Sequence, residues 1–199
     1  MKKRFSTSLM TFLGLFLLTF ALTSCLNDDE REPLPPVTEA EVNGKYEGKL
    51  VTIQAQIRNE KVIKFVASDA EMTFEELPIK EIVSSVISDP LKVNEAVTAI
   101  GKVPYKIAYT RKLLSSSTIV ELKLTPQAIN LEVPVDGTTK TVVATVTTKQ
   151  PGYYGYINGQ KGIIMELHVE KLEVDGVELS TFEPIIYSFP RFVKSNTTN

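Results

Sequence analysis

Residues 163–179 read IIMELHVEKLEVDGVEL, and this stretch decides the fold class. Apolar and polar residues alternate through it, which is typical of a β-strand with one buried face. The dipeptide Asp175-Gly176 interrupts the alternation, and it accepts the positive φ angles of a tight two-residue turn. The stretch therefore predicts a long strand that enters an antiparallel hairpin.

The same period of two continues through the C-terminal half of the chain. The alternating apolar residues are Val103, Tyr105, Ile107 and Tyr109, then Val120, Leu122 and Leu124, then Ile129, Leu131, Val133 and Val135, then Val142, Ala144 and Val146. Turn residues separate these runs, and Asn158-Gly159 marks a further tight hairpin. Strands at this spacing predict an antiparallel barrel or sandwich rather than a parallel sheet.

The N-terminal part of the domain shows two further patterns. Thr38-x-x-Glu41 has the spacing of a capping box and predicts one short helical turn. A strand follows, with Val51, Ile53, Ala55 and Ile57 predicted on its buried face. Residues 58–60 are predicted to turn, and residues 61–66 to return as a second strand.

A helical insertion interrupts the strands. Its apolar stripe consists of Ile79, Ile82, Val83, Val86 and Ile87. A weaker helix is predicted over residues 91–100, with Asp89 as N-cap and Gly101 as stop. The predicted fold is mainly β (α+β), an antiparallel β-barrel or sandwich with a short helical insertion around residues 78–101.

The N-terminus carries a different signal. Three basic residues at positions 2–4 precede an apolar run over 9–22, and Leu22-Thr23-Ser24-Cys25 follows, with the only cysteine of the chain. This pattern resembles bacterial lipoprotein precursors. The resemblance implies that residues 1–24 are a signal peptide, that Cys25 is lipidated and that the protein is held at a membrane by this anchor.

Residues 25–37 read as a tether. The acidic cluster Asp28-Asp29-Glu30 resembles the surface-export signal of Bacteroidetes lipoproteins, and the prolines that follow stiffen the chain. The resemblance implies a lipid-anchored outer-membrane protein, with the cell surface favoured over the periplasmic face. We expect one β-rich domain over residues 38–194 and a frayed tail over residues 195–199.

Charge excludes one class of partner. The chain has 22 basic and 24 acidic residues, and three of the basic ones lie in the predicted signal peptide, so the mature protein carries a net charge near −5. Nucleic acid binding needs basic patches, and we expect none. The sequence contains no Gly-rich phosphate loop, and we expect no cofactor and no metal.

The only histidine gives the one catalytic hypothesis. Glu166, His168 and Glu170 are predicted to lie opposite the apolar face of their strand, which makes them a solvated surface. The alternative is a surface or periplasmic hydrolase that uses Glu166, His168 or Glu170, and we assign no catalytic residue.

Three tyrosines give a binding hypothesis. Tyr153, Tyr154 and Tyr156 lie among glycines, and exposed rings of this kind stack on sugar faces. Strand alternation is expected to bury one or two of them, in which case they serve packing instead.

The start of the domain, Gly44-x-Tyr46-x-Gly48, resembles the opening strands of calycin-like domains, although the chain has no tryptophan. As a whole the chain resembles a Bacteroidetes lipoprotein family of unknown function. The leading hypothesis is a non-catalytic binding or accessory module for a glycan, an apolar small molecule or an envelope partner. A hydrolase and a purely structural envelope protein are the alternatives. The ligand and the oligomeric state remain open.

Overall fold

The computed structural model describes residues 33–195. The predicted signal peptide, Cys25, most of the tether and residues 196–199 lie outside the described residues. The elements are η1 (Ala40–Val42), β1 (Gly44–Gln54), β2 (Ile57–Ala67), β3 (Glu71–Phe74), α1 (Lys80–Val86), α2 (Pro90–Ile100), β4 (Tyr105–Leu113), β5 (Ile119–Pro126), β6 (Ile129–Val135), β7 (Thr138–Thr147), β8 (Gly152–Ile157), β9 (Gln160–Val174), β10 (Val177–Glu178) and β11 (Ile185–Lys194).

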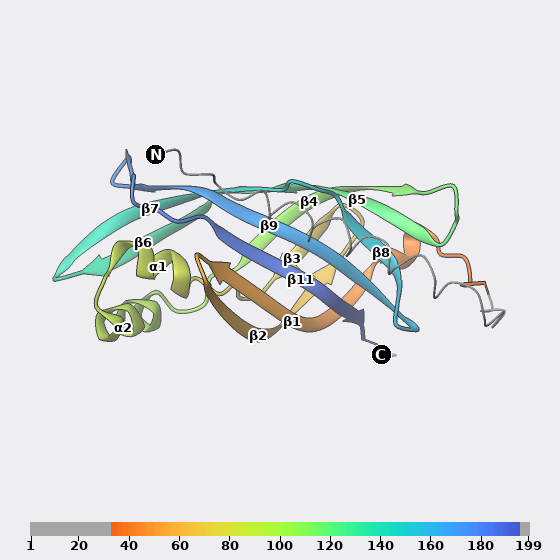
Figure 1. The fold of residues 1–199 in the computed structure, drawn as a ribbon, viewed down its shortest axis with the longest axis horizontal. Coiled ribbons are helices and arrows are strands. Elements are labelled where there is room, and N and C mark those ends of the chain that lie inside the picture. Colours follow the sequence, from red (N-terminus) through yellow and green to blue (C-terminus); the bar gives the residue numbers. More distant parts are fainter. Residues whose placement is uncertain (1–32, 196–199) are drawn as a thin grey trace, which may run out of the picture. The chain divides into compact units, whose positions relative to one another are not determined.

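Eight strands close into an antiparallel barrel. Their order is β1-β2-β3-β4-β5-β8-β9-β11, and β11 pairs with β1 to complete the ring (Figure 1). The predicted fold class is confirmed, and the barrel is the form that the chain adopts.

The long strand β9 shapes the rest of the sheet. Its first part pairs with β8 and its second part with β7, so β6 and β7 leave the ring as a hairpin beyond one end of the barrel. The turns at Asn158-Gly159 and Asp175-Gly176 have positive φ at both residues, as their sequences predict.

Aromatic side chains fill the barrel. The ring of Phe65 lies 5.1 Å from Tyr46, 4.9 Å from Phe74 and 5.5 Å from Phe192, measured between centroids. Phe189 continues the cluster, 5.1 Å from Phe192. All five side chains are buried. The middle of the barrel is therefore a packed core, as in other eight-stranded barrels whose interior side chains fill the ring.

The prediction for the first hairpin is wrong in two ways. The turn lies at residues 55–56, not 58–60. Val51 is buried as predicted, but Ala55 and Ile57 are exposed and Thr52 is buried instead. Apolar alternation alone selected the odd-numbered face of β1. The interior face instead continues from Tyr46 and Leu50, because these side chains complete the aromatic core.

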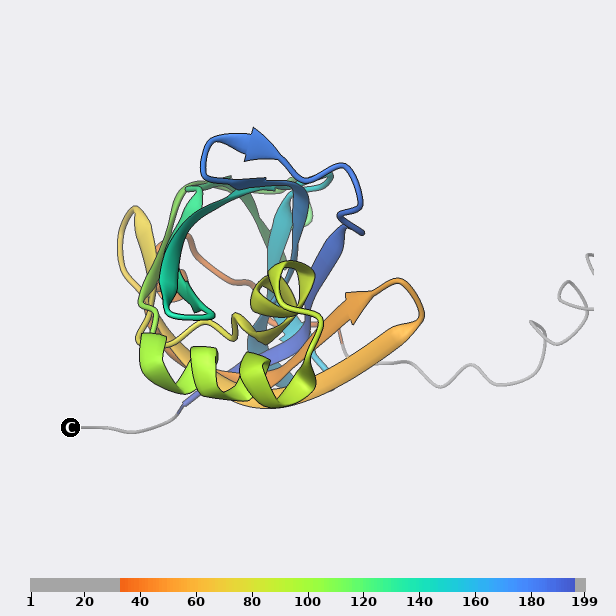
Figure 2. The same cartoon turned by 90° about the vertical axis from the view of Figure 1, so that its left-hand side faces the viewer.

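Each end of the barrel is covered. Figure 2 shows α1 lying across one end of the ring of strands, with α2 alongside. Ile79, Ile82, Val83 and Ile87 are buried as the predicted stripe requires, and Asp89 caps α2 by accepting a hydrogen bond from the Leu91 N–H at 2.9 Å. At the other end η1 buries Val42. Within residues 33–195, no helix has the length and apolar character needed to span a membrane.

Candidate functional site

A cavity of about 310 Å³ lies at the end of the barrel that the helices cover. It is lined by Thr52, Asn59, Glu60, Lys61, Glu76, Leu77, Pro78, Ile79, Lys80, Glu81, Val97 and Gly101. These residues come from the β1–β2 hairpin, the connection from β3 into α1, and the C-terminal part of α2. The volume is at the lower end of the range for small-molecule sites, and apolar walls with a few polar groups are typical of such sites.

Strand register brings polar side chains to this cavity. Thr52 pairs with Asn59 of β2 on one side and with Tyr187 of β11 on the other, so the three residues share one face of the sheet. Thr52 is buried and lines the cavity. The Tyr187 hydroxyl donates a hydrogen bond of 2.8 Å to the Pro78 carbonyl, which fixes the start of α1 against the strands.

Glu81 of α1 is the buried carboxylate of the site. Its exposed fraction is 8%, and its Oε1 accepts a hydrogen bond of 2.9 Å from the Asn59 amide. Its Oε2 is buried and has no hydrogen-bond partner. Among the described residues, no Lys, Arg or His forms an ion pair with it. Burial, and then the negative charge of Glu81, raise the pKa of the Tyr187 phenol.

The backbone around Glu81 is held in place. The Ser85 hydroxyl donates to the Glu81 carbonyl at 2.9 Å. The Gln54 amide in turn donates to the Ser85 hydroxyl at 2.9 Å and to the Glu183 carbonyl at 3.0 Å. These contacts join α1 to β1 and to the segment before β11, so the fold sets the position of the backbone that carries Glu81.

Glu60, Lys61 and Glu76 at the edge of the cavity each have a partner of opposite charge. Lys61 forms an ion pair with Glu76, and the hydrogen bond from Lys61 lowers the pKa of that carboxyl group. Glu60 lies 2.7 Å from the Lys49 ammonium, which lowers its pKa in the same way. The carboxylate of Glu81 therefore differs from its acidic neighbours in the cavity lining.

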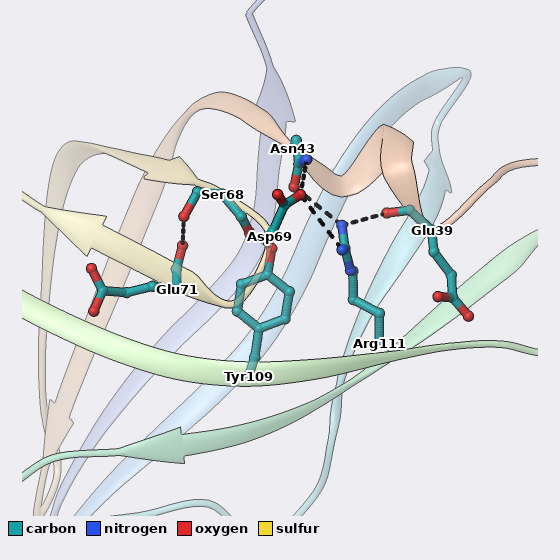
Figure 3. A network of polar contacts seen from close by, with 7 residues as sticks. All are labelled: Glu39, Asn43, Ser68, Asp69, Glu71, Tyr109 and Arg111. Carbon is teal, nitrogen blue, oxygen red and sulfur yellow. Dashed lines mark hydrogen bonds and ion pairs between the residues drawn. The ribbon is translucent and has the colours of Figure 1, made fainter.

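The opposite end of the barrel has a dense polar network, shown in Figure 3. Arg111 of β4 donates to the Glu39 carbonyl at 3.0 Å and to the Asn43 side-chain oxygen at 3.2 Å, and it lies 3.6 Å from Asp69. Asn43 also donates to Asp69 at 2.6 Å. The Tyr109 hydroxyl donates to the Ser68 carbonyl. These contacts bind the segment before β1 to β4 and to the β2–β3 turn.

Glu41 of η1 completes this end. Its Oε2 accepts from the Thr38 N–H at 3.0 Å, as the capping-box spacing predicts, and its Oε1 accepts from Lys161 at 2.6 Å. Lys194 donates to the Glu41 carbonyl at 2.6 Å. The hydrogen bond from Lys161 lowers the pKa of Glu41. The network therefore joins η1 to β9 through Lys161 and to β11 through Lys194.

The three candidate tyrosines do not form one surface. They lie on β8, where Tyr154 is fully buried, Tyr153 is 37% exposed and Tyr156 is partly buried. The Lys161 ammonium lies 5.6 Å from the Tyr156 ring centroid. Tyr153 and Tyr154 point to opposite faces of the strand, as alternation requires.

The prediction of a solvated face at Glu166, His168 and Glu170 is wrong for the histidine. His168 is only 6% exposed, and its Nε2 lies 2.7 Å from the Glu166 Oε1. Glu170 instead lies 3.7 Å from Lys149. Strands β7 and β11 flank β9 at this position, with Thr147 and Ile186 beside the histidine. The contact with Glu166, two residues away on the same face of β9, holds the ring along the strand rather than out in solvent.

Residues 33–195 contain no group of three His, Cys, Asp or Glu side chains that could hold a metal ion.

The sequence did not reveal Glu81, Asn59 or Thr52 as site residues. Glu81 lies outside the apolar stripe of its helix, so that pattern did not mark it as buried, and Asn59 lies in the segment predicted to be a turn. Glu81 is buried because the β1–β2 hairpin contacts the second face of α1 through Gln54 and Asn59. The sequence of α1, KEIVSSV, carries no local pattern that marks Glu81 as a buried side chain.

The family match covers the cavity. A family described as a domain of unknown function (DUF4840) matches residues 41–174, which include Thr52, Asn59 and Glu81. Neither a curated protein nor a solved structure gives a significant match to the chain. Because the match spans more than half of its length, the chain belongs to the DUF4840 family.

Proposed function

We propose that this chain is a lipid-anchored lipoprotein of the bacterial outer membrane, of the Bacteroidetes type, whose barrel binds a small organic ligand without catalysing a reaction. The observation that carries the binding role is the cavity of about 310 Å³ lined by the buried carboxylate of Glu81. A buried polar group without a partner destabilises a fold by about 1–3 kcal/mol, so its presence in a cavity wall supports a role in binding.

The geometry favours this cavity over the other candidate sites. A glycan platform would depend on Tyr153, since Tyr154 is fully buried. A hydrolase would depend on His168, whose ring is 6% exposed and is held by Glu166. General acid–base catalysis needs the ring within hydrogen-bond reach of a substrate. The packed aromatic core supports a site at the end of the barrel rather than a calycin-like site in its middle.

The binding role is tested by native mass spectrometry of the full chain, extracted from its own envelope. We expect a co-purified small molecule on the wild type and none on Val97→Phe, because the larger ring fills the cavity that Val97 lines. Leu91→Phe is the control, since Leu91 lies on the same helix and is 73% exposed. If the native and the ligand-stripped forms have equal masses for the wild type and for both variants, no ligand was bound and the proposal is contradicted.

The anchor is tested separately. Proteinase K treatment of intact and lysed cells should remove the domain in both cases if it is displayed outside. Cys25→Ser should release the chain from the membrane fraction, because the thiol is the predicted acylation site. Retention of this variant in the membrane would contradict a lipid anchor at Cys25.

A further inference from the structure

We infer that the ligand of this cavity is a compact organic cation, with a primary ammonium group on an apolar body, and that the ammonium pairs with Glu81. This inference rests on the proposed binding function and names the chemical class of the ligand.

The carboxylate provides the first argument. Glu81 has no ion-pair partner among the residues of the structure, and its Oε2 accepts no hydrogen bond. A charge-assisted hydrogen bond from an ammonium is about twice as strong as one from a neutral donor. A cation therefore satisfies this group better than a hydroxyl does.

A ligand in the cavity can reach the Glu81 carboxylate after a small change in the side-chain conformation. Its Oε2 is closed off from solvent, but χ3 of glutamate has a broad energy profile, so a bound ammonium can draw a carboxylate oxygen toward the cavity that the side chain lines. The Asn59 amide, which holds Oε1, belongs to an exposed residue. Asn59 can therefore exchange its hydrogen bond for one with water when a ligand binds.

The cavity walls define the rest of the ligand. Leu77, Pro78, Ile79 and Val97 form an apolar lining next to the carboxylate. A volume of about 310 Å³ admits a single ring or a short branched chain with its ammonium group. An apolar body releases water from these walls, which adds to the affinity.

The other acidic groups of the lining are paired, Glu60 with Lys49 and Arg58 and Glu76 with Lys61, so Glu81 carries the remaining negative charge. The cavity lining contains three carboxylates, Glu60, Glu76 and Glu81, and two ammonium groups, Lys61 and Lys80. Lys61 is held by Glu76, so its charge is balanced locally. Lys80 is exposed and is next to Glu81 in sequence, so it opposes a bound cation through solvent.

The test compares two probes of equal shape, 4-fluorobenzylamine and 4-fluorobenzyl alcohol, by ¹⁹F NMR titration of the full chain in detergent. Only the amine carries a positive charge at pH 7. We expect saturable binding of the amine to the wild type and weaker binding of the alcohol. Glu81→Gln keeps the shape of the side chain and should weaken amine binding at least about tenfold, with little change for the alcohol.

Lys80→Met gives a second variant with the opposite expected sign. Removing this like charge should strengthen amine binding by roughly two- to threefold at low salt and leave the alcohol unchanged. Equal binding of both probes, unaffected by either variant, would overturn the cation inference and leave the binding function standing. Absence of amine binding to the wild type would also overturn it, whereas the binding function itself fails only if the native protein carries no ligand.

Discussion

The two ends of the barrel differ in how completely their charged side chains are paired. At the η1 end, Arg111 has three polar partners, and Glu41 binds both Thr38 and Lys161. At the helix end, Glu81 is more deeply buried and leaves one oxygen without a partner. The Tyr154 hydroxyl also has no hydrogen-bond partner, but it is a neutral group. Burial, and then the negative charge of Glu41, raise its pKa.

This difference indicates that the polar groups at the η1 end stabilise the fold, whereas Glu81 at the helix end is available for binding. Paired polar groups at the η1 end fasten the segment before β1 to the strands. An unsatisfied carboxylate at the helix end costs stability, and proteins commonly retain such groups where binding requires them. Substitutions at the two ends should therefore have opposite consequences.

The largest effect is expected at Arg111. Arg111→Met removes the donors to the Glu39 carbonyl and the Asn43 side chain and should lower the free energy of unfolding by about 1–3 kcal/mol. Urea denaturation measures this change. Lys112→Met is the control, because this neighbouring side chain is exposed. Equal stability of the two variants would show that the network in Figure 3 does not fasten this end.

A smaller effect of opposite sign is expected at Glu81. Glu81→Met replaces a desolvated carboxylate by an apolar side chain of similar length, and the exposed Asn59 amide can turn to water. The free energy of unfolding should stay the same or rise by about 1 kcal/mol. Thermal unfolding of Glu81→Met, compared with the wild type and with Lys80→Met as the control, measures this change. A loss of more than about 2 kcal/mol would mean that Glu81 supports the fold, and the contrast between the ends would disappear.

The smallest effect depends on pH and concerns Glu41. The hydrogen bond from Lys161 lowers the pKa of Glu41 in the folded state, so its contribution is present above the ordinary glutamate pKa of about 4.3. That contribution is lost as pH falls through the lowered value. Glu41→Gln should therefore cost less than about 1 kcal/mol at pH 7, since both side chains are partly exposed, and almost nothing well below pH 4.

Urea denaturation of this variant and the wild type at both pH values measures the difference. Glu47→Gln, which removes a pair with Lys64 between two exposed side chains, is the control. A difference that persists unchanged in acid would show that the Glu41 charge is not responsible.

Local patterns predicted the elements better than their faces. The hairpin at Asp175-Gly176 and the stripe on α1 follow from interactions within a few residues, and both agree with the structure. The inward face of β1 and the burial of His168 depend on strands distant in the sequence, and there the predictions are wrong. The candidate site belongs to this second class, since Glu81 meets Asn59 only when the first hairpin packs against α1.

The sequence by itself determined the strand periodicity, the tight turns and the helical insertion, because each depends on residues that are close along the chain. Only the tertiary structure decided that the sheet closes into a barrel and that Glu81 lines a cavity without an ion-pair partner. Ring closure and cavity formation depend on the pairing of β11 with β1 and on the packing of α1 against the β1–β2 hairpin. These contacts join residues that are distant along the chain, and local periodicity carries no information about them.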